Sequence, residues 1–263
     1  MPVHNSTPKK SLGQHWLADP TALESICDAA DLNPEDVVLE IGPGLGTLTQ
    51  LLVQRARQVI AVEFDLQLAA KLPSLVTAGN LQVTAANILN FDLDHLPKGY
   101  KVVANIPYYL TSNLLQVLCE ANNPPKQMSL LVQKEVAQRV AARPGAMSLL
   151  SVSVQYYCEA TLGMIVPAQL FTPPPKVDSQ VLALAYRPEP LFNDVDPKKF
   201  FRVVKAGFSQ RRKKLRSSLA AGLHLSKTAV DELLQSCNID PNGRPQELTL
   251  EQWHAIYRNY RQK

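Results

Sequence analysis

One apolar run that opens directly into a glycine loop constrains the fold of this chain more than any other feature. VVLEI at 37–41 is rich in β-branched side chains and stops at GPGLG, which has glycines at 42, 44 and 46. A run of this length and composition predicts a buried strand. Glycine permits a tight turn and the close approach of a ligand to the backbone. The pattern therefore predicts a strand, a ligand-binding turn and then a helix.

Similar runs follow, and they alternate with helical patterns. This alternation predicts an α/β fold with a doubly wound, parallel sheet and right-handed crossovers. Two later runs, 161–166 and 177–186, have no helix between them and are expected to pair antiparallel at the sheet edge. We expect helices at about 20–30, 47–57 and 66–72, and strands at 58–62, 81–84, 102–104 and 128–132.

The C-terminal part of the chain has a different pattern. RPEPLFNDVDP at 187–197 has the composition of a linker. Beyond it the periodic segments predict helices alone, at about 198–207, 211–221, 226–236 and 249–260. We therefore expect two domains, a large α/β domain at 1–190 and a small all-helical domain at 191–263, which suits a chain of 263 residues.

Positive charge is concentrated in one segment. Of the 27 Lys and Arg residues, nine lie between 198 and 216, where there is no acid, and the other 18 stand against 23 acids elsewhere. Such a run can be a solvated helix face or a surface that binds nucleic-acid phosphates. The candidates for phosphate binding are Arg211, Arg212, Lys213, Lys214 and Arg216.

Composition also excludes several classes of protein. No apolar run approaches the ~18 residues of a transmembrane helix, so we expect no membrane partner. The polar start, MPVHNSTPKKSLGQHW, does not resemble a secretory signal. The four cysteines are far apart and form no CxxC pair, which favours free thiols in the cytoplasm and no metal site.

An acid follows the glycine loop at a spacing typical of nucleotide binding. Glu63 ends the next expected strand, 21 residues after Gly42, where a carboxylate can accept hydrogen bonds from the ribose hydroxyls of an adenosine cofactor. A dinucleotide fingerprint needs glycine at 47, but residue 47 is threonine, which disfavours a nicotinamide dehydrogenase. The spacing from Glu40, E-x-G-x-G-x-G, resembles the S-adenosylmethionine loop of class I methyltransferases.

The tetrad Asn105-Ile106-Pro107-Tyr108 follows another expected strand, at the end where doubly wound sheets bind ligands. An adenine amino group is a poor nucleophile because its lone pair is delocalised into the ring. The Asn105 oxygen and a backbone carbonyl oriented by Pro107 can hold its two N–H groups, and Tyr108 can stack on a base that has left its helix. The tetrad resembles the [DN]-P-P-[YF] motif of amino-group methyltransferases.

Taken together, eight ordered motifs resemble one family, the ribosomal RNA adenine dimethylases, and within it the bacterial small-subunit enzymes. The resemblance covers nearly the whole chain. It implies a Rossmann-like, class I S-adenosylmethionine-dependent methyltransferase domain followed by a small C-terminal all-helical domain. The motifs are SLGQHWL at 11–17, EIGPGLG at 40–46, VEFD at 62–65, NIPY at 105–108, LLVQKEVAQRV at 130–140, SLLSVSVQYY at 148–157, FTPPPKVDS at 171–179 and AGFSQRRKKLRSSL at 206–219.

The resemblance also implies an activity and a partner. Members of the family use S-adenosylmethionine to make N6,N6-dimethyladenosine at two adjacent adenines of a hairpin loop near the 3′ end of 16S rRNA. The implied partner is the assembling small ribosomal subunit, with a late checkpoint role in its biogenesis. The resemblance further implies a monomer that does not act on DNA, and a link between lost methylation and kasugamycin resistance.

Site residues are carried over by position. The resemblance implies that Asn105 and Pro107 hold the target amine, that Tyr108 and Phe171 lie on the two sides of the adenine, and that the basic residues at 211–216 bind RNA. It implies cofactor contacts at His15, Leu17, Gly42, Glu63, Asn87 and Asn105.

Two of these positions depart from the family pattern. His15 stands where asparagine is usual, and it is as consistent with a structural histidine as with a cofactor contact. Asn87 stands where aspartate is usual. Its amide oxygen can still accept a hydrogen bond from an adenine N–H, but without the help of a negative charge, so we expect weaker cofactor affinity rather than a lost reaction.

Three alternatives stay open at this point. One is a large-subunit rRNA adenine methylase of the erythromycin-resistance type, although FTPPPKVDS followed by SQRRKKLR favours the small-subunit branch. Another is a DNA adenine methylase, which the lack of a separate sequence-reading domain disfavours. The third is an assembly factor that binds immature small subunits and hardly methylates, which His15 and Asn87 keep open.

Overall fold

The computed structural model describes residues 8–9, 12–210 and 212–261. The chain divides into two compact units. The first runs to Ala137 and includes Cys158–Tyr186, and the second contains Gln138–Tyr157 and the chain from Arg187 onward. The second unit thus takes in a segment that lies well before the expected boundary near residue 190.

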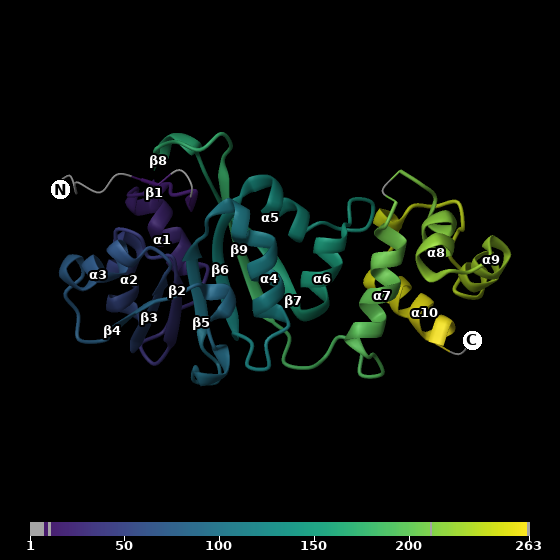
Figure 1. Cartoon of the computed structure of the whole chain (residues 1–263), viewed down its shortest axis with the longest axis horizontal. Coiled ribbons are helices and arrows are strands. Elements are labelled where there is room, and N and C mark those ends of the chain that lie inside the picture. The colour runs from purple at the N-terminus through teal and green to yellow at the C-terminus, as the bar shows by residue number, and fades with distance from the viewer. Residues whose placement is uncertain (1–7, 10–11, 211, 262–263) are drawn as a thin grey trace. The chain divides into compact units, whose positions relative to one another are not determined.

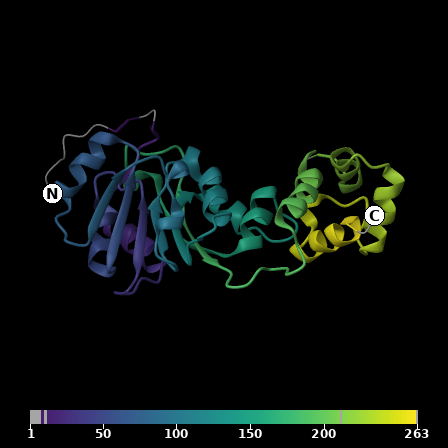
Figure 2. The ribbon, with the colours of Figure 1, turned by 60° about the horizontal axis from the view of Figure 1, so that its bottom comes forward.

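The first unit is built on a seven-stranded sheet in the order β4-β3-β2-β5-β6-β9-β7 (Figure 1). Its parallel part confirms the expected doubly wound α/β fold, and Figure 2 shows these strands lying side by side in a twisted sheet. The strand order reverses between β2 and β5. The parallel strands are β2 (Val37–Ile41), β3 (Gln58–Glu63), β4 (Leu81–Ala85), β5 (Lys101–Asn105) and β6 (Gln127–Gln133).

Two antiparallel strands extend this sheet. β9 (Ser179–Tyr186) pairs with β6, and β7 (Cys158–Val166) pairs with β9, as expected for two runs without a helix between them. The loop between them carries β8 (Phe171–Thr172), which pairs antiparallel with β1 (Trp16–Leu17). This two-residue pairing ties the proline-rich loop to the N-terminal segment.

Local sequence explains where the first helices begin. The Asp19 side chain accepts a hydrogen bond from the Ala22 N–H, and Pro20 occupies the first position of α1. The Asp65 side chain caps α3 in the same way, by accepting from the Gln67 N–H. The helices of this unit are α1 (Pro20–Asp28), α2 (Thr47–Arg55), α3 (Leu66–Leu75), α4 (Thr111–Cys119) and the first part of α5 (Lys134–Val140), whose last three residues belong to the second unit. The short 3-10 turns are η2 (Ile88–Asn90), η3 (Leu93–His95), η4 (Tyr108–Leu110) and η5 (Ala168–Leu170).

The helices α1 and α2 cover one face of the sheet. Their buried apolar side chains pack in one cluster with Val38, Val59 and Val103 of the central strands. Gly46 precedes α2 with a φ of +80°, and a Cβ there would lie 2.7 Å from a Val76 methyl carbon. Glycine is therefore required at this end of the loop by both its conformation and its packing.

The second unit is helical, with a core rich in aromatic side chains. Trp253, Phe200 and Tyr257 are fully buried there, and Tyr156 of α6 stacks on Phe200 with ring centroids 5.2 Å apart. Its elements are α6 (Leu149–Tyr157), α7 (Pro197–Phe208), α8 (Leu215–Leu223), α9 (Lys227–Ser236), η6 (Pro245–Glu247) and α10 (Leu250–Arg261).

One expected helix begins later than the sequence indicated. The helix expected over 211–221 starts at Leu215, because Lys214 is extended and the Leu215 N–H bonds to the Gly243 carbonyl at 2.9 Å. Residues 212–214 therefore lie in an exposed turn before α8. In the described part of the chain no helix is both long and apolar enough to cross a membrane.

A buried ion pair supports the start of β5. The Lys101 side chain is buried, and its Nζ lies 2.9 Å from an Asp36 carboxylate oxygen and also donates to the Asp31 carbonyl. Asp36 additionally accepts the Asn33 N–H at 2.7 Å. The pair thus connects β5 to the turn that precedes β2.

We expect Asp36→Ala to lower the free energy of unfolding by ~3–5 kcal/mol, because it leaves the Lys101 ammonium buried without its counter-ion. Urea unfolding followed by circular dichroism measures the change. Asp28→Ala is the matched control, since the Asp28 partner of Arg55 is exposed and such pairs contribute less than ~1 kcal/mol. Equal losses in the two variants would contradict this account.

Candidate functional site

A cavity of about 300 Å³ lies at the carboxyl ends of the parallel strands in the first unit. Loops after β2, β3, β4 and β5 form its walls, together with the segments around β1 and β8. The strand order reverses here, which is where doubly wound sheets bind ligands. Nine residues expected to hold cofactor or adenine line this one cavity: His15, Leu17, Gly42, Glu63, Asn87, Asn105, Pro107, Tyr108 and Phe171.

The glycine loop after β2 exposes its backbone to the cavity. Gly42 has a φ of +68°, and a Cβ built on it would meet nothing within 4 Å. Its N–H donates to the Val62 carbonyl at 2.9 Å, which fixes the loop against the end of β3. The space beside Gly42 is thus left open for a ligand that approaches the backbone.

Glu63 ends β3 and is held by backbone donors. One carboxylate oxygen accepts the Gly44 N–H at 3.1 Å, and the other accepts the Asp65 N–H at 2.8 Å. Burial raises the pKa of Glu63, and these hydrogen bonds oppose that shift. Each oxygen keeps a lone pair for a further donor, as ribose recognition requires.

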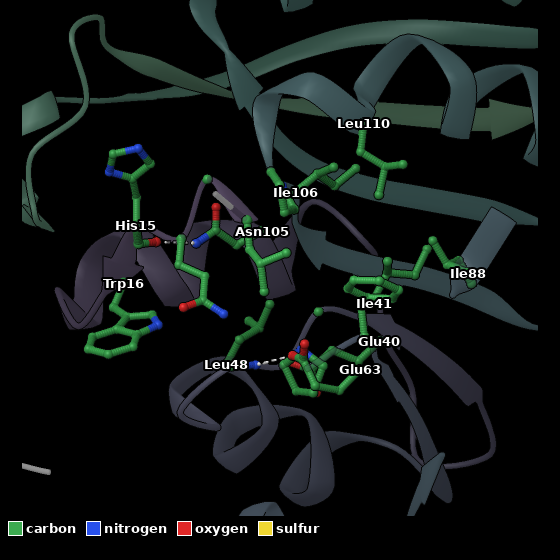
Figure 3. A pocket seen from close by; sticks show the side chains of 18 of the residues that line it. His15, Trp16, Glu40, Ile41, Leu48, Glu63, Ile88, Asn105, Ile106 and Leu110 are labelled. Carbon is green, nitrogen blue, oxygen red and sulfur yellow. Dashed lines mark hydrogen bonds between the residues drawn. The ribbon is translucent and has the colours of Figure 1, made fainter. Parts of the chain in front are cut away.

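Glu40 lies beneath the same loop and is only 1% exposed. Neither of its carboxylate oxygens accepts a hydrogen bond from the described residues. Burial raises its pKa to about 8, which the Glu63 charge reinforces and the nearby Thr49 hydroxyl opposes. Figure 3 shows Glu40 and Glu63 close together, across the cavity from His15. A positive charge on a ligand beside this buried carboxyl group would favour its ionised form.

Asn105 ends β5 with its amide already oriented. Its Nδ2 donates to the His15 carbonyl at 3.3 Å, a contact drawn in Figure 3, which leaves Oδ1 as an acceptor. The Pro107 carbonyl accepts the Leu110 N–H at 3.0 Å, whereas no hydrogen bond from the described residues reaches the Ile106 carbonyl. The tetrad therefore offers two acceptors, Asn105 Oδ1 and the Ile106 carbonyl.

The Tyr108 ring is held from two sides. Its hydroxyl lies 2.9 Å from the Ser179 hydroxyl, and its ring stacks on His15 with centroids 5.9 Å apart and planes 22° apart. His15 Nδ1 lies 2.7 Å from the Pro173 carbonyl, so this nitrogen carries the proton and donates. The His15 side chain therefore joins the tetrad to the proline-rich loop.

The remaining expected residues have contrasting environments. Leu17 and Phe171 are buried and paired across β1 and β8, with their side chains in the core cluster. Asn87 is exposed, and its Oδ1 accepts the Leu89 N–H at 3.1 Å. One lone pair of that oxygen is therefore already used.

Sequence reasoning missed some residues of the cavity. Phe64 and Tyr109 line it and are strongly exposed, and each directly follows an expected site residue, which was the available signal. The Thr47 hydroxyl donates to the Leu17 carbonyl at 2.8 Å and joins α2 to β1. Lys9 forms a 2.7 Å ion pair with Asp65, for which the sequence held no local signal.

The basic segment lies in the second unit. Arg212, Lys213 and Lys214 are exposed, and the Lys214 ammonium donates to Asn242 at 2.8 Å. Arg216 lies 3.3 Å from an Asp231 carboxylate oxygen. Arg211 falls outside the described residues. Of the described candidates for phosphate binding at 212–216, Arg212 and Lys213 are thus the two without a side-chain partner among the described residues.

Comparisons with known proteins agree with this arrangement. A family model described as ribosomal RNA adenine dimethylase matches residues 5–262. Ribosomal RNA small subunit methyltransferase A of Dehalococcoides mccartyi strain CBDB1 is 40% identical over 261 residues, which cover 96% of this chain and 88% of that protein. A dimethyladenosine transferase from Plasmodium falciparum has a TM-score of 0.81 at 25% identity, covering 94% of this chain and 98% of its own. The 23S rRNA methyltransferase ErmE has a TM-score of 0.76 at 29% identity, covering 93% and 98%.

Glu40 should make the stability of the ligand-free protein depend on pH. Between its unfolded pKa near 4.5 and its folded pKa of about 8, the folded state binds more protons, so the free energy of unfolding falls as pH rises. The fall is at most ~1.4 kcal/mol per pH unit. We expect Glu40→Gln to remove this contribution in urea unfolding between pH 6 and 8. The exposed control Glu35→Gln should follow the wild-type curve, and parallel curves for all three proteins would contradict the assignment.

Proposed function

Because this chain belongs to the ribosomal RNA adenine dimethylase family, it is an S-adenosylmethionine-dependent rRNA adenine dimethyltransferase, and we propose that its targets are two adjacent adenines in the 3′-terminal hairpin loop of 16S rRNA. The observation that carries the proposal is the single cavity in which the glycine loop, Glu63 and the NIPY tetrad meet. The small-subunit relative is 40% identical, against 29% for the 23S enzyme ErmE, which supports the small-subunit substrate.

The cavity fits S-adenosylmethionine on its own chemistry. The open backbone at Gly42, the hydrogen-bond acceptors of Glu63 and the unpartnered carboxyl group of Glu40 match an adenosine that carries positive charge. When bound, the cofactor supplies a methyl group on a sulfonium, which is an electrophile. His15 and Leu17 would border its methionine end, and Asn87 its adenine, where the partly used Oδ1 supports weaker binding.

The tetrad would position the target amine. Asn105 Oδ1 and the Ile106 carbonyl can accept the two N–H groups of a flipped adenine. The carbonyl is set by Pro107, and the base stacks on Tyr108 with Phe171 on its other side. Most of the rate enhancement then comes from orientation and electrostatics, because the amine attacks a strong electrophile. Each transfer would form one N–C bond at the amine and release one proton from it, while the methyl–sulfur bond breaks and S-adenosylhomocysteine is left.

The basic segment would bind rRNA phosphates. Arg212 and Lys213 are the strongest candidates because both are exposed and have no ion-pair partner among the described residues. Lys214 and Arg216 would contribute less, since each is already engaged by Asn242 or Asp231. Arg211 is also proposed to bind phosphate, because it lies in the same basic run of the sequence. Phosphate contacts of this kind provide affinity rather than sequence recognition.

The proposal extends to the setting in which the enzyme works. We propose a cytoplasmic monomer that acts late in small-subunit assembly, with no DNA or membrane partner, and whose loss confers kasugamycin resistance. All four cysteines are free, which fits a reducing compartment.

Asn105→Ala should strongly slow methyl transfer while small-subunit binding is kept. Removal of one acceptor from the reacting amine is expected to lower kcat by ~100-fold or more. Methyl incorporation into unmethylated small subunits measures kcat, and sedimentation with subunits measures binding. Asn113→Ala, at an exposed position of α4, is the matched control. Wild-type turnover in Asn105→Ala would rule out the acceptor role.

The double variant Arg212→Ala with Lys213→Ala should weaken binding to small subunits and reduce the log–log salt slope by about 1–2, because two phosphate contacts are lost. Binding measured from 50 to 300 mM salt gives both quantities. Affinity for S-adenosylhomocysteine should not change. Lys227→Ala is the control, because it removes an exposed charge from α9. If the double variant had the same log–log salt slope as Lys227→Ala, the RNA-binding role would be contradicted.

A further inference from the structure

Two consecutive tyrosines in η4 have opposite environments. Tyr108 points inward, and its hydroxyl is bonded to Ser179. Tyr109 is 65% exposed, and its side chain makes no hydrogen bond to the described residues. Both line the cavity, so the exposed ring of Tyr109 stands at its mouth. An exposed aromatic ring beside a ligand cavity offers a planar face on which a second planar group can stack.

The Tyr109 ring is backed by the N-terminal segment. Two of its ring carbons lie 3.5 and 3.6 Å from the position that a Cβ on Gly13 would take, and a Pro107 carbon lies 3.9 Å from it. Gly13 itself has a φ of +59°, so the turn brings bare backbone against the ring. One part of the ring thus packs on the protein, and the rest is left open to solvent.

This arrangement suits a flat, neutral and unpaired ligand. No charged side chain of the described residues pairs with Tyr109, so the ring offers apolar area and a π-face. Unpaired RNA bases are commonly bound in this way, by stacking on aromatic side chains. A base next to the flipped adenine must remain near the mouth of the cavity, because the two nucleotides share one backbone.

We propose that Tyr109 is a stacking platform for the unpaired base next to the target adenine. The inference rests on the proposed function and adds to it a second base contact at the mouth of the cavity. Because the two target adenines are adjacent, the one that is not reacting would lie on Tyr109 while the other is methylated. Tyr109 is therefore a substrate-positioning residue, distinct from the acceptors that hold the amine.

Steady-state kinetics on unmethylated small subunits test the platform. Tyr109→Ala should raise the KM for subunits by ~10-fold, within the range measured for stacked bases. Tyr109→Phe should stay within about twofold of wild type because the ring is kept. Affinity for S-adenosylhomocysteine should be unchanged in both variants. Leu162→Ala, at an exposed apolar position of β7, controls for loss of surface apolar area.

A second arm tests stacking directly by RNA binding in the presence of S-adenosylhomocysteine. The probes are two RNA hairpins, one with two adjacent loop adenines and one in which the second adenine is replaced by an abasic nucleotide. Wild type and Tyr109→Phe should bind the abasic hairpin ~10-fold more weakly, whereas Tyr109→Ala should bind both hairpins equally.

The outcomes separate the inference from the proposed function. An unchanged KM in Tyr109→Ala would overturn the platform. So would an equal loss in Tyr109→Phe and Tyr109→Ala, or an equal abasic penalty in wild type and Tyr109→Ala. Absence of methyl transfer by wild type to small subunits would overturn the proposed function instead. The hairpin measurement would still decide whether Tyr109 stacks on a base.

Discussion

The reversal of strand order between β2 and β5 is the constraint on which the rest of the site depends. The loops that leave these two strands run to opposite faces of the sheet, so a crevice remains between the loops at the carboxyl ends of the strands. The glycine loop leaves β2 into that space, and the tetrad enters it from β5. Glu63 arrives from β3 and is fixed by the Gly44 N–H. The backbone topology therefore brings the loops that line the cavity to one place.

Long-range contacts then close this crevice into a cavity. The β1–β8 pair brings the N-terminal segment and the proline-rich loop together above the strand ends. His15 connects them to the tetrad, through its ring on Tyr108, its Nδ1 on Pro173 and its carbonyl on the Asn105 amide. These three contacts show how the protein itself holds a histidine at this position. The bond from its Nδ2 leaves Asn105 Oδ1 available as an acceptor.

Local patterns were sufficient for the parallel strands, the glycine loop and its acid, because each is determined by residues within a few positions of one another. Residues 138–157 pack with the C-terminal helices through contacts distant in sequence, which composition around 187–197 did not indicate. Helix α8 starts late because of a bond to Gly243, and β1 and β8 are too short to have a pattern. Arg211 lies outside the described residues. The sequence predicted that the Asn87 oxygen would be available to adenine, and it did not indicate that this oxygen accepts a capping hydrogen bond from the Leu89 N–H.

We propose that one cavity brings the cofactor together with an adenine of small-subunit rRNA. The most direct test of this proposal is methyl transfer from labelled S-adenosylmethionine to unmethylated small subunits, large subunits and duplex DNA in parallel, with mass spectrometry of the digested nucleosides. We expect N6,N6-dimethyladenosine from small subunits alone. This proposal would be contradicted by dimethyladenosine from large subunits, by methyladenine from DNA, or by tight binding to small subunits without methyl incorporation.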